Sequence, residues 1–349
     1  MSMSNGALSK IQTRQVCYAV ASFCLGAWAF YKVNTISGPF FEPIIAACQN
    51  PDFSVDDFAQ KTGYHSYEPK LGLGAFNLLV CLITQFLLEL RETHPAGILT
   101  WGGVIVVSLP LALFNSICAG RRGGKGPVRY PTAFGLLFQL FGISVMYPML
   151  YNPSYIFSGV RFGVPATNFR IIAATILSLP GIILTFLVFY APTESYLWTC
   201  AAGMLGGPIL VMTGLFFWMD KSSSMEGSTQ NIMKSSNLLQ NAYSLLAMVT
   251  FIFWWCLMAV AFQTYGFEIG LLWRDIWVEA GPSVAFMTVD TGVLFLGELL
   301  LIAYESEWKA VKAFALTPLV GPGAAICLVL IELELEGTAA LLNGAKKDV

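Results

Sequence analysis

Apolar and polar residues alternate along this chain in long blocks, not position by position. Runs of about 20 mostly apolar residues, almost free of Asp, Glu, Lys and Arg, are separated by shorter stretches that hold most of the charges. A helix needs roughly 20 apolar residues to cross the ~30 Å hydrocarbon core of a bilayer. Only helices and closed barrels satisfy their backbone hydrogen bonds there. Because the apolar runs are continuous, they predict helices and not the alternating strands of a barrel.

The blocks predict an all-α, polytopic membrane protein with eight or nine transmembrane helices. We expect one transmembrane domain over residues 1–349, with a short polar N-terminus (1–15) and a polar C-terminal tail (336–349). The first apolar run has no cleavage site after it, which favours a retained span over a signal peptide. The candidate spans are 16–34, 72–90, 97–118, 130–151, 169–191, 194–218, 241–264, 284–304 and 309–332.

The last candidate span contains helix-breaking residues. Pro318 is followed by the run Gly321-Pro322-Gly323-Ala324. We expect a kinked span packed by small residues, and a break into two half-helices is the alternative.

Composition supports the membrane assignment and excludes several functions. The chain is 56% hydrophobic and 11% charged, whereas soluble domains are about 25% charged. A net charge of −2 argues against a nucleic-acid partner. The eight cysteines form no CxxC pair, and the two histidines, His65 and His94, lie far apart. Since Walker A, HExxH, GxSxG and DDxxD sequences are also missing, we expect no metal and no cofactor.

The charges do not give an orientation. Nine single spans would divide the 19 Lys and Arg residues almost equally between the two sides of the membrane. The positive-inside rule then favours neither side. In particular, the basic loop at 121–129 opposes the basic N-terminus.

Two spans carry acidic residues that are costly in a membrane and therefore candidates for function. In the second span, Asn77, Gln85 and Glu89 fall on one helical face with Cys81, and Glu92 continues it. Glu89 is a candidate acid, or it is held structurally by a hydrogen bond or by Arg91 or Arg122.

The eighth span carries a second acidic face with Asp290, Glu298 and, further on, Glu305. A carboxyl group removed from water at Asp290 is expected to keep its proton near neutral pH, which is the state needed to donate it. We favour a functional role for Asp290 over the alternative, a hydrogen bond between helices.

Aromatic residues make up 14% of the chain. Most are expected to pack in the core or lie at the membrane interfaces. Inside a cavity their faces would instead stabilise a cation. The candidates for such a wall are Tyr147, Phe217, Trp218, Trp254 and Trp255.

Several segments together resemble the membrane-bound terpene cyclases of fungal meroterpenoid pathways, of the ascochlorin, ascofuranone and macrophorin type. The resemblance extends from about residue 35 to 335. The segments that carry it are Glu89-Leu-Arg-Glu-Thr-His-Pro-Ala-Gly97, Ala119-Gly-Arg-Arg122, Arg129-Tyr-Pro131, Asp290 and Gly321-Pro-Gly-Ala324.

The resemblance implies an enzyme of the endoplasmic reticulum membrane. Such enzymes protonate an epoxide or olefin of a farnesyl-type chain on a meroterpenoid and cyclise it without metal or diphosphate loss. The partners would be an oily prenylated substrate and membrane lipid. Asp290 or Glu89 would donate the proton, and Glu92, Glu298 or Arg122 would tune or reprotonate it.

Two other functions remain open. A proton-coupled transporter or channel would use the acids as proton relays and the Gly-Pro-Gly break as part of a binding site. A non-catalytic scaffold would pair its acids and leave no cavity of ligand size, roughly 300 Å³.

Overall fold

The computed structural model describes residues 5–49, 86–192 and 229–345. These residues are helical apart from turns and short loops, and no strand occurs among them. The helices are α1 (Asn5–Gln49), α4 (Ala96–Gly120), η1 (Pro127–Arg129), α5 (Pro131–Phe141), α6 (Ile143–Met146), η2 (Tyr147–Tyr151), α7 (Asn152–Ser158), α8 (Asn168–Ser178), α9 (Pro180–Tyr190), α12 (Thr229–Tyr265), α13 (Ile269–Arg274), η3 (Asp275–Glu279), α14 (Pro282–Glu305), α15 (Glu307–Val320) and α16 (Pro322–Ala345).

The chain is an α-helical membrane protein. Five helices in the described residues are long and apolar enough to cross a bilayer, judged by length and composition, and they confirm five expected spans as apolar helices. They are Gln12–Ile36, Ala96–Gly120, Asn168–Tyr190, Thr229–Tyr265 and Pro282–Glu305. The expected span 194–218 and most of 72–90 lie outside the described residues. The expected total of eight or nine spans is not confirmed.

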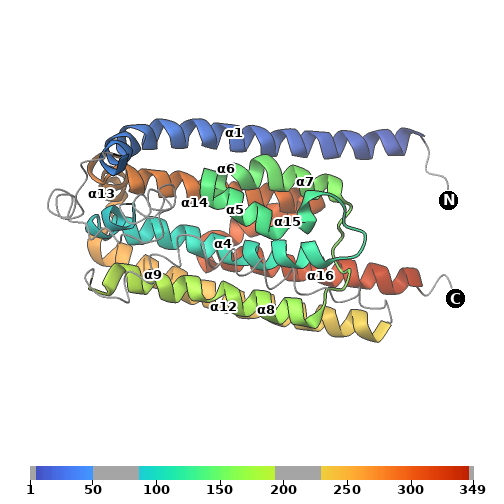
Figure 1. Ribbon diagram of the computed structural model, residues 1–349. Coiled ribbons are helices and arrows are strands. Elements are labelled where there is room, and N and C mark those ends of the chain that lie inside the picture. Colours follow the sequence, from blue (N-terminus) through green and yellow to red (C-terminus); the bar gives the residue numbers. More distant parts are fainter. Residues whose placement is uncertain (1–4, 50–85, 193–228, 346–349) are drawn as a thin grey trace.

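The long helices run side by side along one direction (Figure 1). In this view α1 forms the upper edge, α12 with α8 and α9 the lower edge, and α4, α14 and α16 lie between them. The most extensive contacts are those of α12 with α16, α1 with α14, and α14 with α4. The start of α1 and the end of α16 lie at the same end of the bundle.

Segment 130–151 was expected to be a single span, and this prediction is wrong: the segment is part of a helical hairpin. Its first arm is α5, and its second arm is the continuous run α6, η2 and α7. The rings of Phe134 and Tyr151 lie 5.1 Å apart, and those of Phe138 and Tyr147 6.4 Å apart, so the arms are antiparallel. The chain reverses at Gly142, whose φ of 88° suits glycine. We call residues 131–158 the first hairpin.

Segment 309–332 is also a hairpin, so the expected kinked span is wrong and the break is correct. Lys309 pairs with Glu336, at 2.6 Å, and Lys312 pairs with Glu332, which places α15 and α16 antiparallel. The reversal occurs at Gly321, with φ of 84°, and Pro322 then begins α16. We call residues 307–345 the second hairpin.

Both hairpins open toward the same end of the bundle and place their tips near its middle. Gly142 faces Asp290, in the middle of α14. Gly321 lies against Trp254 of α12, and Gly323 lies against the backbone of Val106, in the middle of α4. Because each hairpin returns to the end where it started, neither carries the chain from one end of the bundle to the other.

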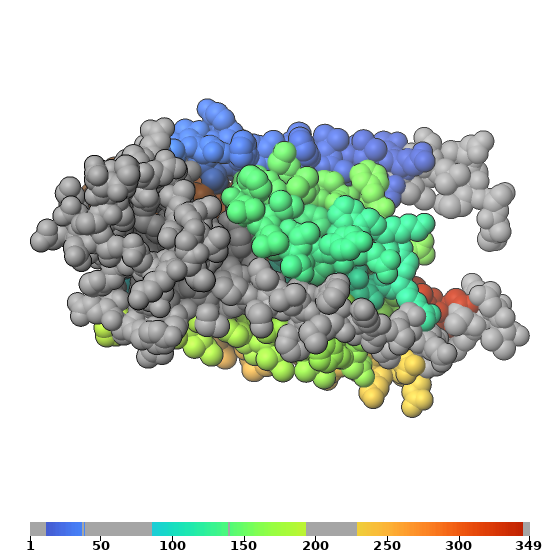
Figure 2. All heavy atoms as spheres, viewed as in Figure 1, coloured from blue at the N-terminus to red at the C-terminus, as the bar shows by residue number. Residues whose placement is uncertain are grey.

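The first hairpin also lies on the outside of the molecule. Figure 2 shows it in teal to green beside α1. Its first arm exposes Leu136, Leu140 and Phe141. Such an apolar outer surface suits contact with lipid chains.

Candidate functional site

The candidate site centres on Glu298 of α14. Its side chain is 3% exposed, and neither carboxylate oxygen has a hydrogen-bond partner among the described residues. It lines a cavity together with side chains of α4, η2, α14 and α16, and these neighbours are aliphatic or aromatic. They are Leu111, Phe114, Tyr147, Leu301, Ile302, Ile326 and Leu330. The void holds about one water molecule, so it is smaller than a pocket for a ligand.

Tyr147 forms the aromatic wall of this cavity. Its ring is buried and stacks on Tyr151, with centroids 5.3 Å apart. Gly297 permits this close packing, because a Cβ there would come within 3.2 Å of the Tyr147 ring. Tyr147 therefore lines the cavity beside a buried acid, and its expected role in binding a substrate stays a prediction.

Hydrogen bonds hold the second arm of the first hairpin against α1 and α14. The amide nitrogen of Asn152 donates to the carbonyl of Gly297 at 2.8 Å and to the hydroxyl of Ser22 at 3.0 Å. Ser22 in turn donates to the carbonyl of Pro148 at 2.7 Å. The Tyr147 wall is therefore fixed by polar contacts on both sides.

Asp290 occupies a different place on α14, about 12 Å from Glu298 along the helix axis. It is 5% exposed and faces the tip of the first hairpin. The backbone N–H of Ser144 donates to its Oδ1 at 3.3 Å. Ser144 lies in the first turn of the second arm, where N–H groups lack intrahelical partners and the helix dipole favours an anion.

Glu89 has a structural partner. Ser283, at the start of α14, donates to its carboxylate through the hydroxyl at 2.7 Å and through the backbone N–H at 3.3 Å. Glu89 thus caps the N-terminus of α14 from a neighbouring helix. Arg91 bonds the carbonyls of Val188 and Ala191 instead of Glu89, and Glu92 is exposed.

The remaining sequence candidates do not gather around the cavity. Arg122 is exposed in a loop at the end of the bundle opposite to Glu89 and Glu92, so it does not hold or tune those acids. Trp254 packs on the tip of the second hairpin. Trp255 is 47% exposed on the outer face of α12 and so does not wall the interior. Asn77, Gln85, Phe217 and Trp218 lie outside the described residues.

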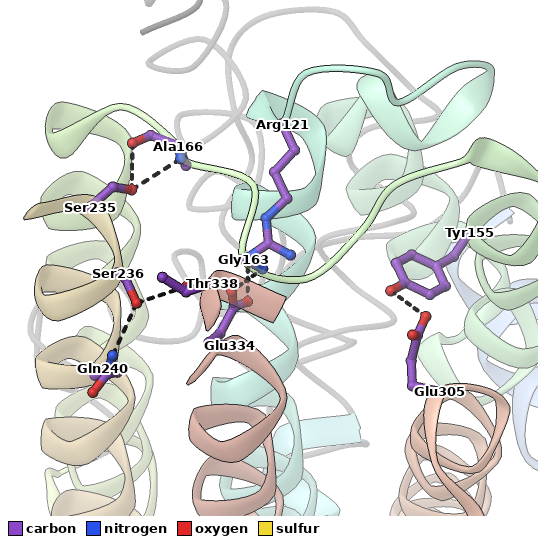
Figure 3. Close-up of polar contacts among 10 residues, drawn as sticks. All are labelled: Arg121, Tyr155, Gly163, Ala166, Ser235, Ser236, Gln240, Glu305, Glu334 and Thr338. Carbon is purple, nitrogen blue, oxygen red and sulfur yellow. Dashed lines mark hydrogen bonds and ion pairs between the residues drawn. The ribbon is translucent and has the colours of Figure 1, made fainter. Parts of the chain in front are cut away.

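Sequence reasoning missed a buried ion pair. Arg121, just after α4, points to Glu334 of α16, and the N–H of Gly163 donates to the same carboxylate at 2.9 Å (Figure 3). Burial alone would lower the pKa of Arg121, but the carboxylate of Glu334 raises it above its usual value, so the guanidinium stays charged. Phe162 lies under the guanidinium, 5.4 Å from ring centroid to Cζ.

A sequence signal for this pair existed. Glu332, Glu334 and Glu336 alternate at the end of the last apolar run, and each pairs with a different cation: Lys312, Arg121 and Lys309. Acids so close to a span imply partners. Two of these ion pairs therefore join the arms of the second hairpin to each other, and the third joins the hairpin to the loop after α4.

Comparisons with known proteins do not add to this chemistry. No family model matches the chain, and the searches of curated proteins and of solved structures gave no match. Among the described residues, no three His, Cys, Asp or Glu side chains gather as a metal site would require. The arrangement itself offers one buried, unpartnered acid in an apolar and aromatic cavity, and a second acid at a helix start.

Proposed function

We propose that the chain is an integral membrane terpene cyclase, which starts the cyclisation of a farnesyl-type prenyl chain by donating a proton. The observation that carries the proposal is Glu298, buried and without a partner among aliphatic and aromatic side chains. An unpaired charge costs many kcal/mol in such surroundings, so the neutral acid is the favoured form. A neutral carboxylic acid beside an oily substrate is a proton donor.

The reaction balances without a co-reactant. Glu298 donates its proton to the epoxide oxygen or to the terminal alkene carbon of the substrate, and this leaves a carbocation. The double bonds of the chain attack that cation in turn and close the ring. The faces of Tyr147 and Phe114 shield the cation. Loss of a proton to a carboxylate, for which Asp290 is suited by its bond from the Ser144 N–H, ends the sequence. That proton must return to Glu298 before the next turnover.

The proposal requires the cavity to widen. A prenyl chain needs far more room than one water molecule. Because hydrogen bonds hold the arm that carries Tyr147, the second hairpin must move away from it when substrate binds. The exposed apolar surface of the first hairpin is consistent with a substrate that arrives from the lipid phase. We place the enzyme in the endoplasmic reticulum membrane, as the sequence resemblance implies.

The test is a pair of substitutions assayed in membranes with a prenyl-epoxide meroterpenoid. Glu298→Gln keeps the shape of the side chain but has no proton to donate, and we expect the cyclised product to fall by about 10²–10⁴-fold. Asp290→Asn is expected to slow the reaction as well. Glu307→Gln, at an exposed position at the start of α15, is the matched control and should retain wild-type activity.

Wild-type activity in both Glu298→Gln and Asp290→Asn, at equal protein level, would falsify the assignment. Product loss in the Glu307→Gln control would show instead that the assay reports expression and not chemistry.

A proton-coupled transporter is the second candidate, and the two hairpins favour it. Half-helices that meet at the middle of a bundle form the substrate and ion sites of many transporters. Purified protein in sealed liposomes separates the two functions. A transporter would accumulate unchanged substrate under a proton gradient, whereas a cyclase would convert it without any gradient.

A further inference from the structure

The charges of the described residues are distributed unevenly between the two ends of the bundle. The segments at the end toward which both hairpins open are the start of α1, the loops after α4 and α7, and the starts of α8, α12 and α15. These segments contain most basic side chains of the described residues: Arg14, Arg121, Arg122, Lys125, Arg129, Arg161, Arg170, Lys234, Lys309 and Lys312. The exceptions are Lys32, Arg91 and Arg274.

The first hairpin is one reason why the sequence alone concealed this asymmetry. If 130–151 were one span, Arg129 and Arg161 would lie on opposite sides of the membrane. Because the first hairpin returns to its starting end, the loops at 121–130 and 159–167 lie together. The backbone N–H of Lys125 donates to the carbonyl of Ser158 at 2.8 Å and joins the two loops.

Acidic groups at this end are already engaged. Glu305 accepts from the hydroxyl of Tyr155 at 2.8 Å, and Glu307 lies 3.7 Å from Arg14. The other acids there are Glu332, Glu334 and Glu336, each in an ion pair.

Three cations of the two joined loops stay unneutralised. Lys125, Arg129 and Arg161 are exposed, and no ion pair joins them to an acid in the part of the chain that the structure describes. We call these three residues the basic surface. Beside it, Tyr130 is 67% exposed, and an exposed tyrosine next to a span is typical of the headgroup region of a bilayer.

We infer that the basic surface faces the cytosol and binds the headgroups of anionic phospholipids in the cytosolic leaflet. Loops rich in Lys and Arg stay on the cytosolic side when a membrane protein inserts. That leaflet carries a negative surface potential that attracts such residues. The binding free energy is about 1 kcal/mol for each Lys or Arg, which corresponds to roughly a fivefold increase in the binding constant. The inference needs only the membrane location and is independent of the proposed activity.

Glycosylation mapping tests the orientation. The natural sequence has no N-x-S/T acceptor, so an inserted one reports its own side. A Gly-Ser linker with one acceptor is placed between Gly123 and Gly124, or between Gly266 and Phe267 at the opposite end. In yeast microsomes we expect the second insertion to be glycosylated and the first to stay unmodified. The reverse pattern overturns the inference.

Lipid binding tests the headgroup contact in the intact protein. Native mass spectrometry in mixed phosphatidylserine and phosphatidylcholine micelles counts bound lipids for the wild type and for Lys125→Gln/Arg129→Gln/Arg161→Gln. We expect phosphatidylserine binding to weaken by at least fivefold in the triple variant, with phosphatidylcholine binding unchanged. The control is Lys32→Gln/Arg274→Gln, which removes cations away from this end.

Two results contradict the lipid contact. One is unchanged phosphatidylserine binding in the triple variant. The other is an equal loss in the control, which would mean that only the total charge matters. Because all five substitutions are at exposed positions, the variants are expected to fold, and a thermal melt in detergent checks this.

Discussion

At the scale of single residues, the buried pair of Arg121 and Glu334 makes the fold sensitive to the loss of either side chain. Both side chains are almost fully removed from solvent, and the pair joins the loop after α4 to the second hairpin. Removing one member of a buried pair leaves the other as an uncompensated charge, which costs about 3–5 kcal/mol. Replacing both members by apolar residues avoids that cost.

We therefore predict that Arg121→Met and Glu334→Gln each lower the melting temperature in detergent by many degrees. The double variant Arg121→Met/Glu334→Leu is expected to recover a large part of the loss. Fluorescence-detected size-exclusion chromatography after heating gives the midpoints. Midpoints of the single variants equal to that of the wild type would show that the pair does not stabilise the fold.

At the scale of elements, the two hairpin tips depend on glycine to different degrees. Gly142 and Gly321 both have positive φ with extended ψ, a conformation that costs other residues about 1–3 kcal/mol. At Gly142 there is open space for a Cβ, with its nearest neighbour at 3.9 Å. At Gly321 a Cβ would come within 2.5 Å of the Trp254 ring.

Gly321→Ala is accordingly predicted to destabilise the protein more than Gly142→Ala, since it adds a clash to the backbone strain. Gly292→Ala is the control: Gly292 lies inside α14 with nothing near its added methyl group, and alanine favours a helix. Thermal midpoints of the three variants should follow the order Gly292→Ala, Gly142→Ala, Gly321→Ala, from highest to lowest. An equal effect at both tips would exclude the contact with Trp254 as a cause.

The segment formed by α13 and η3 is a second element with a defined place in the bilayer. It lies at the end opposite to the termini (Figure 1) and is too short to cross a membrane. Trp273 is 64% exposed and lies 5.6 Å from Trp277, and the neighbouring charges of Arg274 and Glu279 pair at 2.8 Å. Tryptophans beside paired charges suit the headgroup region.

Brominated lipids can measure how deep in the bilayer the segment of α13 and η3 lies. The fluorescence of Trp273 is obtained as the difference between the wild type and Trp273→Phe. We predict that this contribution is quenched best by bromines near the headgroup. Trp255, exposed on the outer face of α12 and away from its ends, is the control. Its contribution is predicted to be quenched best by bromines near the ends of the lipid chains. If aqueous acrylamide quenches Trp273 and no lipid does, the segment lies outside the bilayer.

The sequence predicted the membrane bundle well and the hairpins only in part. Apolar run length identifies a helix that spans, but two half-helices joined by one glycine give a run of the same length and hydropathy. Gly321 stood beside Pro322 and Gly323, and this cluster indicated a break. Gly142 stood alone in an apolar run and gave no such signal.

The candidate site was also predictable only in part. Glu298 and Asp290 were identified because acids in apolar runs are conspicuous. Ser144, which bonds Asp290, was not identified, because it reaches that acid only through the fold of the first hairpin. Tyr147 was identified as a candidate wall, but not as a neighbour of Glu298. Glu89 stayed ambiguous for the same reason: Ser283, which it caps, is 194 positions away in the chain.

At the scale of the whole molecule, the number of membrane crossings decides whether the two chain ends lie on the same side. Nine single spans would put the two termini on opposite sides. In the structure, the start of α1 and the end of α16 lie at the same end of the bundle. The two hairpins alone would not produce this, because nine crossings less two leave seven, still an odd number. In addition, α1 ends at the same end of the bundle at which α4 begins, whereas a single span at 72–90 would have separated them.

We predict that epitope tags fused to the two ends of the chain behave alike in sealed microsomes. Added protease should remove both tags or neither, because a sealed membrane gives it access to one side only. A soluble lumenal protein that stays intact controls for leakage, and detergent should make both tags digestible. Loss of one tag alone would require an odd number of crossings and would contradict the placement of both chain ends on one side.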